Sequence, residues 1–244
     1  MATLPQLIDP DHYQPCDWNL RNDSAALEQW LVLFCGHVDL VIEHIRKAYP
    51  HATADQLEAF RTEHIATFER VRDATHEHID VLMLTHLRRE VQDRHGFRDP
   101  FLAVKQRENG IALRLLPETL AEIDTEPAER QLELLTRNLM AGNVFDLGAV
   151  PAIARFQAGD AAFRKTRDSL SPRPWFVDDL AEFTARLDAG PAYQHLMMFV
   201  DNAGSDVCLG CLPLARWFAQ RGTRVTLAAN SYPALNDITA EDLP

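Results

Sequence analysis

Two short apolar runs near the C-terminal end, each followed by a polar turn, constrain the fold of this chain most strongly. The first run covers residues 195–200 and leads into Asp-Asn-Ala-Gly-Ser-Asp at 201–206. The second run covers residues 223–229, is β-branched at its start, and leads into a polar stretch at 230–237. The length of the first run and the turns that bound it predict a buried strand rather than a helix, and the second run is also strand-like.

The segment between the two runs predicts that the strands are parallel. Residues 207–220 are long enough to form the crossover helix of a βαβ unit, and Arg221-Gly222 is a typical helix stop. Parallel strands bring the residues that follow them to the same edge of the sheet, where open α/β sheets bind ligands. We therefore expect Asp201, Asn202 and Asp237 to meet there.

These three side chains offer only oxygen ligands, which favour hard divalent ions such as Mg²⁺ or Mn²⁺. An ion held by them would neutralise charge on a phosphoryl group and acidify a water molecule. Asp206, one turn into the crossover helix, is a candidate general base, and the amino-terminal end of that helix suits an anion. In the alternative interpretation, Asp201 and Asp206 only cap the helix and Asp237 closes a turn.

The rest of the sequence has helical periodicity. Residues 1–22 are expected to form an irregular arm, residues 23–188 a helical domain, and residues 189–244 the βαβ unit, which makes the fold class α/β and mainly α on its N-terminal side. A capping box is expected at Thr53 to Gln56, and Pro117 is expected to interrupt a helix. The expected helices cover residues 23–49, 53–95 in two parts joined near 73–78, 99–115, 126–140, 149–156, 161–169 and 177–187.

Two glycines bracket an amide and an acid in the stretch from Gly142 to Gly148. Such a stretch allows a sharp turn that presents Asn143 and Asp146 to a ligand. The alternative is a helix stop followed by an N-cap.

The charge balance restricts the partners of the protein. Lys and Arg number 24 and Asp and Glu number 36, which gives a formal net charge of −12. A surface of this sign repels nucleic acid and anionic lipid, so an anionic substrate requires a local positive centre such as a metal ion. The N-terminus has no signal-peptide pattern, and no uninterrupted apolar run approaches the roughly 20 residues that span a bilayer. The expectation is a soluble, cytoplasmic protein without a nucleic-acid or membrane partner.

Cys208 and Cys211 have the spacing of a zinc or thiol-redox pair, but no second pair accompanies them. Free cysteine also packs as a small apolar residue, and we expect this role for both thiols in the crossover helix. The histidines fall mainly on expected helices with apolar neighbours, a pattern more typical of packing than of metal ligation.

Several motifs resemble the damage-control phosphatase family, whose metal-binding domain was formerly of unknown function. The resemblance is to the subgroup that includes plant stand-alone members and the 4′-phosphopantetheine phosphatase domain fused to a pantothenate-kinase-like half. It extends over roughly residues 20–239, and the motifs occur in the same order along the chain as in the family. The matching stretches are residues 105–110, 141–149, 173–175, 201–206, 212–214 and 221–239.

The resemblance implies a helical N-terminal part packed on an incomplete Rossmann-like parallel α/β part. It also implies metal-dependent hydrolysis of small phosphomonoesters, such as 4′-phosphopantetheine, its damaged forms or sugar phosphates, with Mn²⁺, Co²⁺, Ni²⁺ or Mg²⁺. The implied metal ligands are Asp201, Asn202 and Asp237, and Asp206 would orient the water. The expected substrate-binding residues are Asn143, Asp146, Asn230, Ser231, Lys105 and Glu108, of which the last two could instead form an ion pair between helices.

One departure from the family separates two functional hypotheses. Family members continue well beyond the position of Pro244 with further strands and helices, so we expect this chain to be a fragment, a truncated relative or one part of a split protein that needs a C-terminal half. The first hypothesis is a phosphatase. The alternative is a non-catalytic helical binding or regulatory module that retains the metal-binding loops.

Overall fold

The computed structural model describes residues 17–73, 77–144, 160–190 and 193–243. The chain divides into two compact units. The N-terminal unit comprises Met1–Ile42 and Ala52–Phe97, and the C-terminal unit comprises Glu43–His51 and Arg98–Pro244. This division cuts across the expected helical domain at 23–188, whose boundaries stay a prediction.

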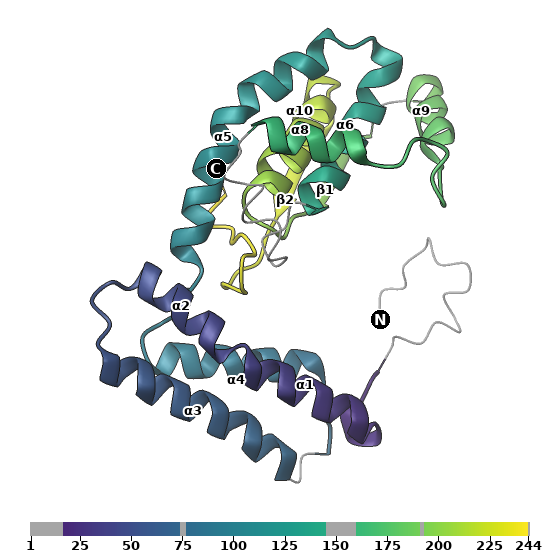
Figure 1. Ribbon diagram of the computed structural model, residues 1–244. Helices are drawn as coiled ribbons and strands as arrows, with labels where there is room; N and C mark the ends of the chain where they lie inside the picture. The colour runs from purple at the N-terminus through teal and green to yellow at the C-terminus, as the bar shows by residue number, and fades with distance from the viewer. Residues whose placement is uncertain (1–16, 74–76, 145–159, 191–192, 244) are drawn as a thin grey trace. The chain divides into compact units, whose positions relative to one another are not determined.

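Helices form the described part of the N-terminal unit (Figure 1). The expected continuous helix at 23–49 is wrong in one detail, because a turn at His37 separates α1 from α2. The capping box is confirmed: Thr53 N donates to Gln56 Oε1 at 2.9 Å, and Gln56 N donates to Thr53 Oγ1 at 3.2 Å. The elements are η1 (Leu20–Asn22), α1 (Ser24–Gly36), α3 (Ala54–Asp73), α4 (Val81–Arg94) and the part of α2 (Val38–Ala48) that ends at Ile42.

An aromatic cluster lies in the core of this unit. The ring centroids of Phe34 and Phe68 are 4.9 Å apart, and that of the His64 imidazole lies 5.0 Å from that of Phe68. His64 is fully buried, with Nε2 3.0 Å from the carbonyl oxygen of Phe34. Burial lowers the pKa of His64, which favours the neutral ring at physiological pH. This histidine therefore packs in the core, as expected from its apolar neighbours.

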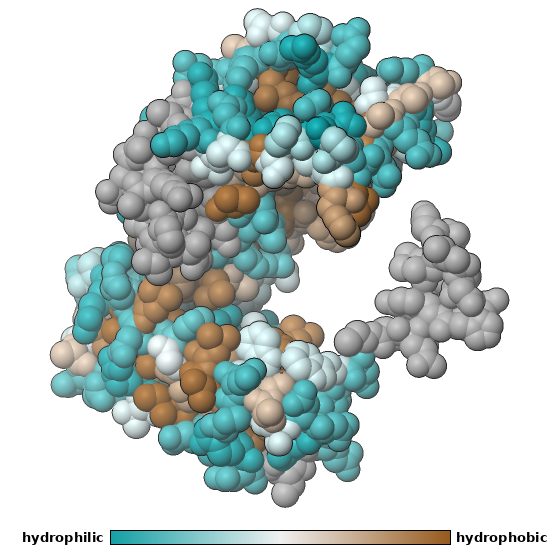
Figure 2. All heavy atoms as spheres, turned by 45° about the vertical axis from the view of Figure 1, so that its right-hand side comes forward, coloured by the Kyte–Doolittle hydropathy of each residue, from teal (hydrophilic) through white to brown (hydrophobic). Residues whose placement is uncertain are grey.

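The stretch Ser24–Ala48, which covers α1 and α2, is long and apolar enough to cross a membrane by length and composition alone. The core helix of a soluble protein passes the same test, and 39% of the apolar window is buried inside the structure. Hydrophobic side chains are also visible on the surface of the N-terminal unit (Figure 2). Val32, Leu33 and Leu40 are among its exposed hydrophobic residues. This feature is weak evidence for a membrane span.

The C-terminal unit contains the two strands and the helices around them (Figure 1). The prediction that Pro117 interrupts a helix is wrong, because α5 continues through it. An internal proline costs a helix about 3 kcal/mol, and the turns beyond it bury the apolar side chain of Ile123, which contributes in the opposite direction. The elements are α5 (Leu102–Thr125), α6 (Ala128–Val144), α8 (Asp160–Ser169), α9 (Leu180–Ala189), β1 (His195–Phe199), η2 (Asp206–Cys211), α10 (Leu212–Gln220) and β2 (Arg224–Ala228).

The expected βαβ unit is confirmed. Strands β1 and β2 pair in parallel, in a register that aligns His195 with Arg224 and Phe199 with Ala228. Only one face of this sheet is covered by the residues that the structure describes. Leu196 and Met198 pack in the core on that face, whereas 52% of Met197 and 82% of Phe199 are exposed on the other. The first run is therefore a strand as predicted, but only one of its two faces is buried.

The crossover begins as a π-helix, η2, before it continues as α10. The helix that the alternative interpretation ends at Gly142 continues to Val144, so Gly142 and Asn143 lie inside α6. The remainder of the expected turn, residues 145–148, lies outside the described residues. Gly142 instead allows close packing: a Cβ atom at this position would lie 2.7 Å from Asp206 Cα in η2. The glycine is needed for the approach of two helices rather than for a turn.

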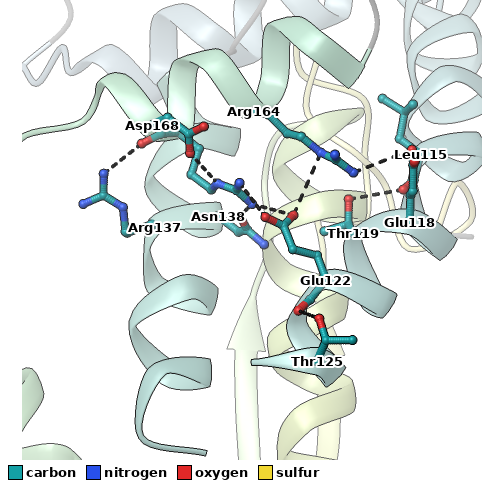
Figure 3. Close-up of polar contacts among 10 residues, drawn as sticks. Leu115, Glu118, Thr119, Glu122, Thr125, Arg137, Asn138, Arg164 and Asp168 are labelled. Carbon is teal, nitrogen blue, oxygen red and sulfur yellow. Dashed lines mark hydrogen bonds and ion pairs between the residues drawn. The ribbon is translucent and has the colours of Figure 1, made fainter. Parts of the chain in front are cut away.

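A charged cluster joins α8 to α5 and α6. The buried Arg167 guanidinium donates to both carboxylate oxygens of Glu122, at 2.9 and 2.8 Å, and contacts Asn138. Figure 3 shows Glu122 facing Arg164 as well. Burial opposes the charge on Arg167, but its hydrogen bonds to Glu122 raise its pKa above the ordinary value. Glu122 is partly exposed, but the two hydrogen bonds to the buried Arg167 connect α8 to α5.

The Gly142→Ala substitution tests the close approach of α6 and η2. We expect it to lower the free energy of unfolding by roughly 1–3 kcal/mol, because the new methyl group overlaps backbone that cannot move independently. Unfolding in urea, followed by circular dichroism, measures the change.

Gly110→Ala in α5 is the matched control. A Cβ atom there would meet only the end of Arg114, at 3.9 Å. Alanine is favoured over glycine inside a helix by roughly 0.5–1 kcal/mol, so this variant should be as stable as the parent chain or slightly more stable. Equal effects of the two substitutions would contradict the packing argument.

Candidate metal-binding site

The two polar turns that follow β1 and β2 are joined by backbone hydrogen bonds. Ile238 N donates to Asp201 O, and Ala203 N donates to Asn236 O at 3.0 Å. Asn202 and Asp237 form an isolated antiparallel bridge. The structure therefore brings together the segments of all three expected metal ligands, although they lie far apart in the sequence. We call residues 201–204 the first turn and residues 234–239 the second turn.

Neighbouring groups orient the three side chains. Asp237 Oδ2 accepts a hydrogen bond from Asn230 Nδ2 at 2.8 Å, and Asn202 Oδ1 accepts one from Asn236 Nδ2 at 3.0 Å. Asp201 Oδ1 accepts from the backbone N–H of Asn202 at 2.9 Å. Hydrogen bonds of this kind hold ligand oxygens in place and limit their rotation.

The donor set fits a hard divalent cation. Carboxylate and amide oxygens each have two lone pairs, so an oxygen that accepts one hydrogen bond can also bind an ion. Across the described ranges, no three His, Cys, Asp or Glu side chains form a metal cluster. The first and second turns offer two carboxylates, and the third oxygen comes from the amide of Asn202. This set suits Mg²⁺ or Mn²⁺ better than a soft ion.

Asp206, the candidate general base, is buried at the start of η2. The negative charges of Asp206 and Asp201 act electrostatically on the thiol of Cys211. Burial raises the pKa of Cys211 to about 12, and the two carboxylates act in the same direction. The site therefore has a negative potential, which attracts a cation.

Of the residues expected on the substrate side, some lie beside the two turns and others lie elsewhere or outside the described residues. Asp201, Asn230 and Ser231 line a hollow at the carboxyl ends of the two strands. Asn143 is exposed in the last turn of α6. Asp146 lies outside the described residues. The structure thus groups Asn230 and Ser231 with the metal candidates, and their role stays a prediction.

Lys105 and Glu108 are both buried in α5. The ammonium group of Lys105 lies 2.7 Å from Asp99 Oδ2 and 2.7 Å from Asp242 Oδ2. Glu108 Oε1 accepts a hydrogen bond from Arg107 at 2.9 Å. The acids that pair with Lys105 therefore come from outside α5, and its contribution to substrate binding stays a prediction.

Three polar residues at the site were missed by reasoning from the sequence. Asn109 Oδ1 accepts a hydrogen bond from Gly204 N at 2.7 Å, Asn236 orients Asn202, and Asp242 holds Lys105. A signal for Asn109 was present, because it lies four residues after Lys105 and therefore on the same helix face. No spacing rule indicated Asp242.

A family comparison agrees with this geometry. The model of the damage-control phosphatase ARMT1-like domain matches residues 36–244. The chain belongs to this family. Members are generally metal-dependent, which is consistent with an oxygen-rich site, although neither the ion nor its ligands are identified by the match.

Three curated relatives extend the comparison. Damage-control phosphatase At2g17340 of Arabidopsis thaliana is 37% identical over 100% of this chain and 70% of its own length. The 4′-phosphopantetheine phosphatase of Mus musculus is 34% identical over 98% of this chain, and pantothenate kinase 2 of Arabidopsis thaliana is 36% identical over 100% of it. This chain spans only 30% and 28% of the length of these last two relatives.

The cysteine pair provides a test of the local environment. Burial raises the pKa of both Cys208 and Cys211 to about 12, so almost no thiolate forms at pH 8. We expect iodoacetamide to alkylate these thiols at least about 100-fold more slowly in the folded protein than in urea. Mass spectrometry of the peptides measures the rates. Fast labelling of the folded chain would revive the thiol-redox interpretation.

Proposed function

We propose that this chain is part of a metal-dependent phosphatase that hydrolyses small phosphomonoesters. The observation that supports the proposal is the backbone pairing of the two turns, which brings the segments that carry Asp201, Asn202 and Asp237 side by side after the two parallel strands. Such an edge is where open α/β sheets bind ligands, and the oxygen donors found there suit a divalent ion. Family membership supports the same activity.

The residues at this edge suggest how the reaction proceeds. Asp201, Asn202 and Asp237 would hold the ion, which when bound supplies positive charge to the phosphoryl oxygens. Asp206 would accept a proton from the attacking water as the new P–O bond forms and the ester P–O bond breaks, and this proton would then pass to the leaving alkoxide oxygen. The products are an alcohol and inorganic phosphate. Asn230 and Ser231 lie beside Asp201 in the hollow and can donate hydrogen bonds to the phosphate.

The substrate class follows from charge and from relatives. With a formal net charge of −12, the protein repels anions except where a cation compensates. The mouse relative is named for 4′-phosphopantetheine, so we propose this compound, its damaged forms and sugar phosphates as substrates. That a further segment completes the pocket stays a prediction. The cytoplasmic location also stays a prediction.

Phosphate release tests the proposal. The purified chain should hydrolyse 4′-phosphopantetheine or p-nitrophenyl phosphate in Mn²⁺, Co²⁺, Ni²⁺ or Mg²⁺, and chelation of the ion should stop the reaction. Asp201→Ala removes a ligand, so we expect kcat/KM to fall by more than the 10–100-fold that is typical when only a ligand-orienting partner is lost.

Asp179→Ala is the matched control, because Asp179 is an exposed carboxylate at the start of α9 without a side-chain capping bond. This variant should keep the parent activity. Activity that survives Asp201→Ala would refute the assigned site. Tight metal binding without hydrolysis of any substrate would instead favour the non-catalytic binding module.

A further inference from the structure

Two polar side chains on one face of α5 each contact a different part of the site. Lys105 and Asn109 are separated by four residues, so they lie one helical turn apart on the same face. Lys105 is only 1% exposed. Asn109 bonds the first turn directly, whereas Lys105 bonds Asp242, three residues beyond the second turn.

Lys105 reaches the second turn through a short chain of hydrogen bonds. Its ammonium group donates to Asp242 Oδ2 at 2.7 Å, and the same oxygen accepts from Thr239 Oγ1 at 2.8 Å. Thr239 is bridged in parallel to Asn230, whose side chain donates to Asp237 Oδ2. The position of the Asp237 carboxylate is therefore connected to a buried cation on α5.

Asn109 acts on the first turn. Its Oδ1 accepts a hydrogen bond from Gly204 N at 2.7 Å, across 95 residues of sequence. Gly204 has a positive φ of 82°, a conformation that few other residues adopt, so the turn depends on this backbone geometry. The amide of Asn109 holds the turn that carries Asp201 and Asn202.

We propose that Lys105 and Asn109 are positioning residues that hold the two turns in the register required for metal binding. The inference rests on the proposed metal site and deepens it. It assigns Lys105 to the support of the ion site rather than to the substrate, because Asp99 and Asp242 already surround its ammonium group. Loss of a partner that orients metal ligands typically weakens metal affinity by 10–100-fold.

Direct measurement of Mn²⁺ affinity by isothermal titration calorimetry tests this inference without relying on activity. We expect Lys105→Met to bind Mn²⁺ about 10–100-fold more weakly than the parent chain, with the far-UV circular dichroism spectrum unchanged. Phosphatase activity should fall at limiting Mn²⁺ and recover at saturating Mn²⁺. A residue that contacts substrate would instead raise KM at every Mn²⁺ concentration.

Asn109 provides an independent pair of variants. Asn109→Leu keeps the branched shape of the side chain but has no acceptor for Gly204 N, so its Mn²⁺ affinity should fall by about 10-fold or more. Asn109→Asp retains the acceptor oxygen and should bind Mn²⁺ at least as well as the parent chain. Rescue by aspartate separates a hydrogen-bonding role from a packing role.

Arg216→Met is the control for general loss of an ion pair. Arg216 makes two hydrogen bonds to Asp124, at 2.8 and 2.7 Å, in the same unit but with no described contact to either turn. Its Mn²⁺ affinity should equal that of the parent chain. A fall as large as that of Lys105→Met would overturn the inference.

The remaining outcomes also decide between the proposals. Unchanged Mn²⁺ affinity in Lys105→Met, or in Asn109→Leu if the lysine variant does not fold, overturns the positioning role. A parent chain that binds Mn²⁺ but releases no phosphate contradicts the proposed enzyme, while the affinities of the variants still test the positioning role. A parent chain that does not bind Mn²⁺ at all overturns both.

Discussion

The backbone hydrogen bonds between the two turns are the interaction on which the site depends. They join Asp201 to Ile238 and Ala203 to Asn236, and so they bring two segments from different loops into one strip of polar groups. A backbone pairing fixes position more tightly than side-chain contacts alone, because each peptide group is planar and its donor and acceptor point in set directions. The geometry of the oxygen donors follows from this pairing.

Packing beneath the first turn restricts it further. The π-helix that follows the turn lies so close to α6 that only a glycine fits at position 142. Short π-helical segments are rare and occur often at functional sites, where they shift the direction of side chains by a fraction of a turn. The burial of Cys208 and Cys211 on this segment shows that it forms part of the core as well as the edge of the site.

Charge is distributed around the site in two layers. The carboxylates of Asp201 and Asp237 lie at the sheet edge, and a cation is the natural complement to them. Below this edge, Lys105 is buried between Asp99 and Asp242. Burial raises the pKa of Asp242, but the hydrogen bonds from Lys105 and Thr239 outweigh it and hold the pKa below its ordinary value. Asp242 therefore stays charged at physiological pH and remains ion-paired with Lys105.

The sequence by itself determined the features that depend on local pattern: the two parallel strands, the meeting of their turns, and the capping box at Thr53. Strand length, turn residues and a crossover segment of helical length indicate these without knowledge of distant contacts. Tertiary structure decided that α5 continues through Pro117, that Gly142 serves close packing, and that Lys105 pairs with Asp242, 137 residues away. Periodicity reports which face of a helix is buried, but not which partner covers it.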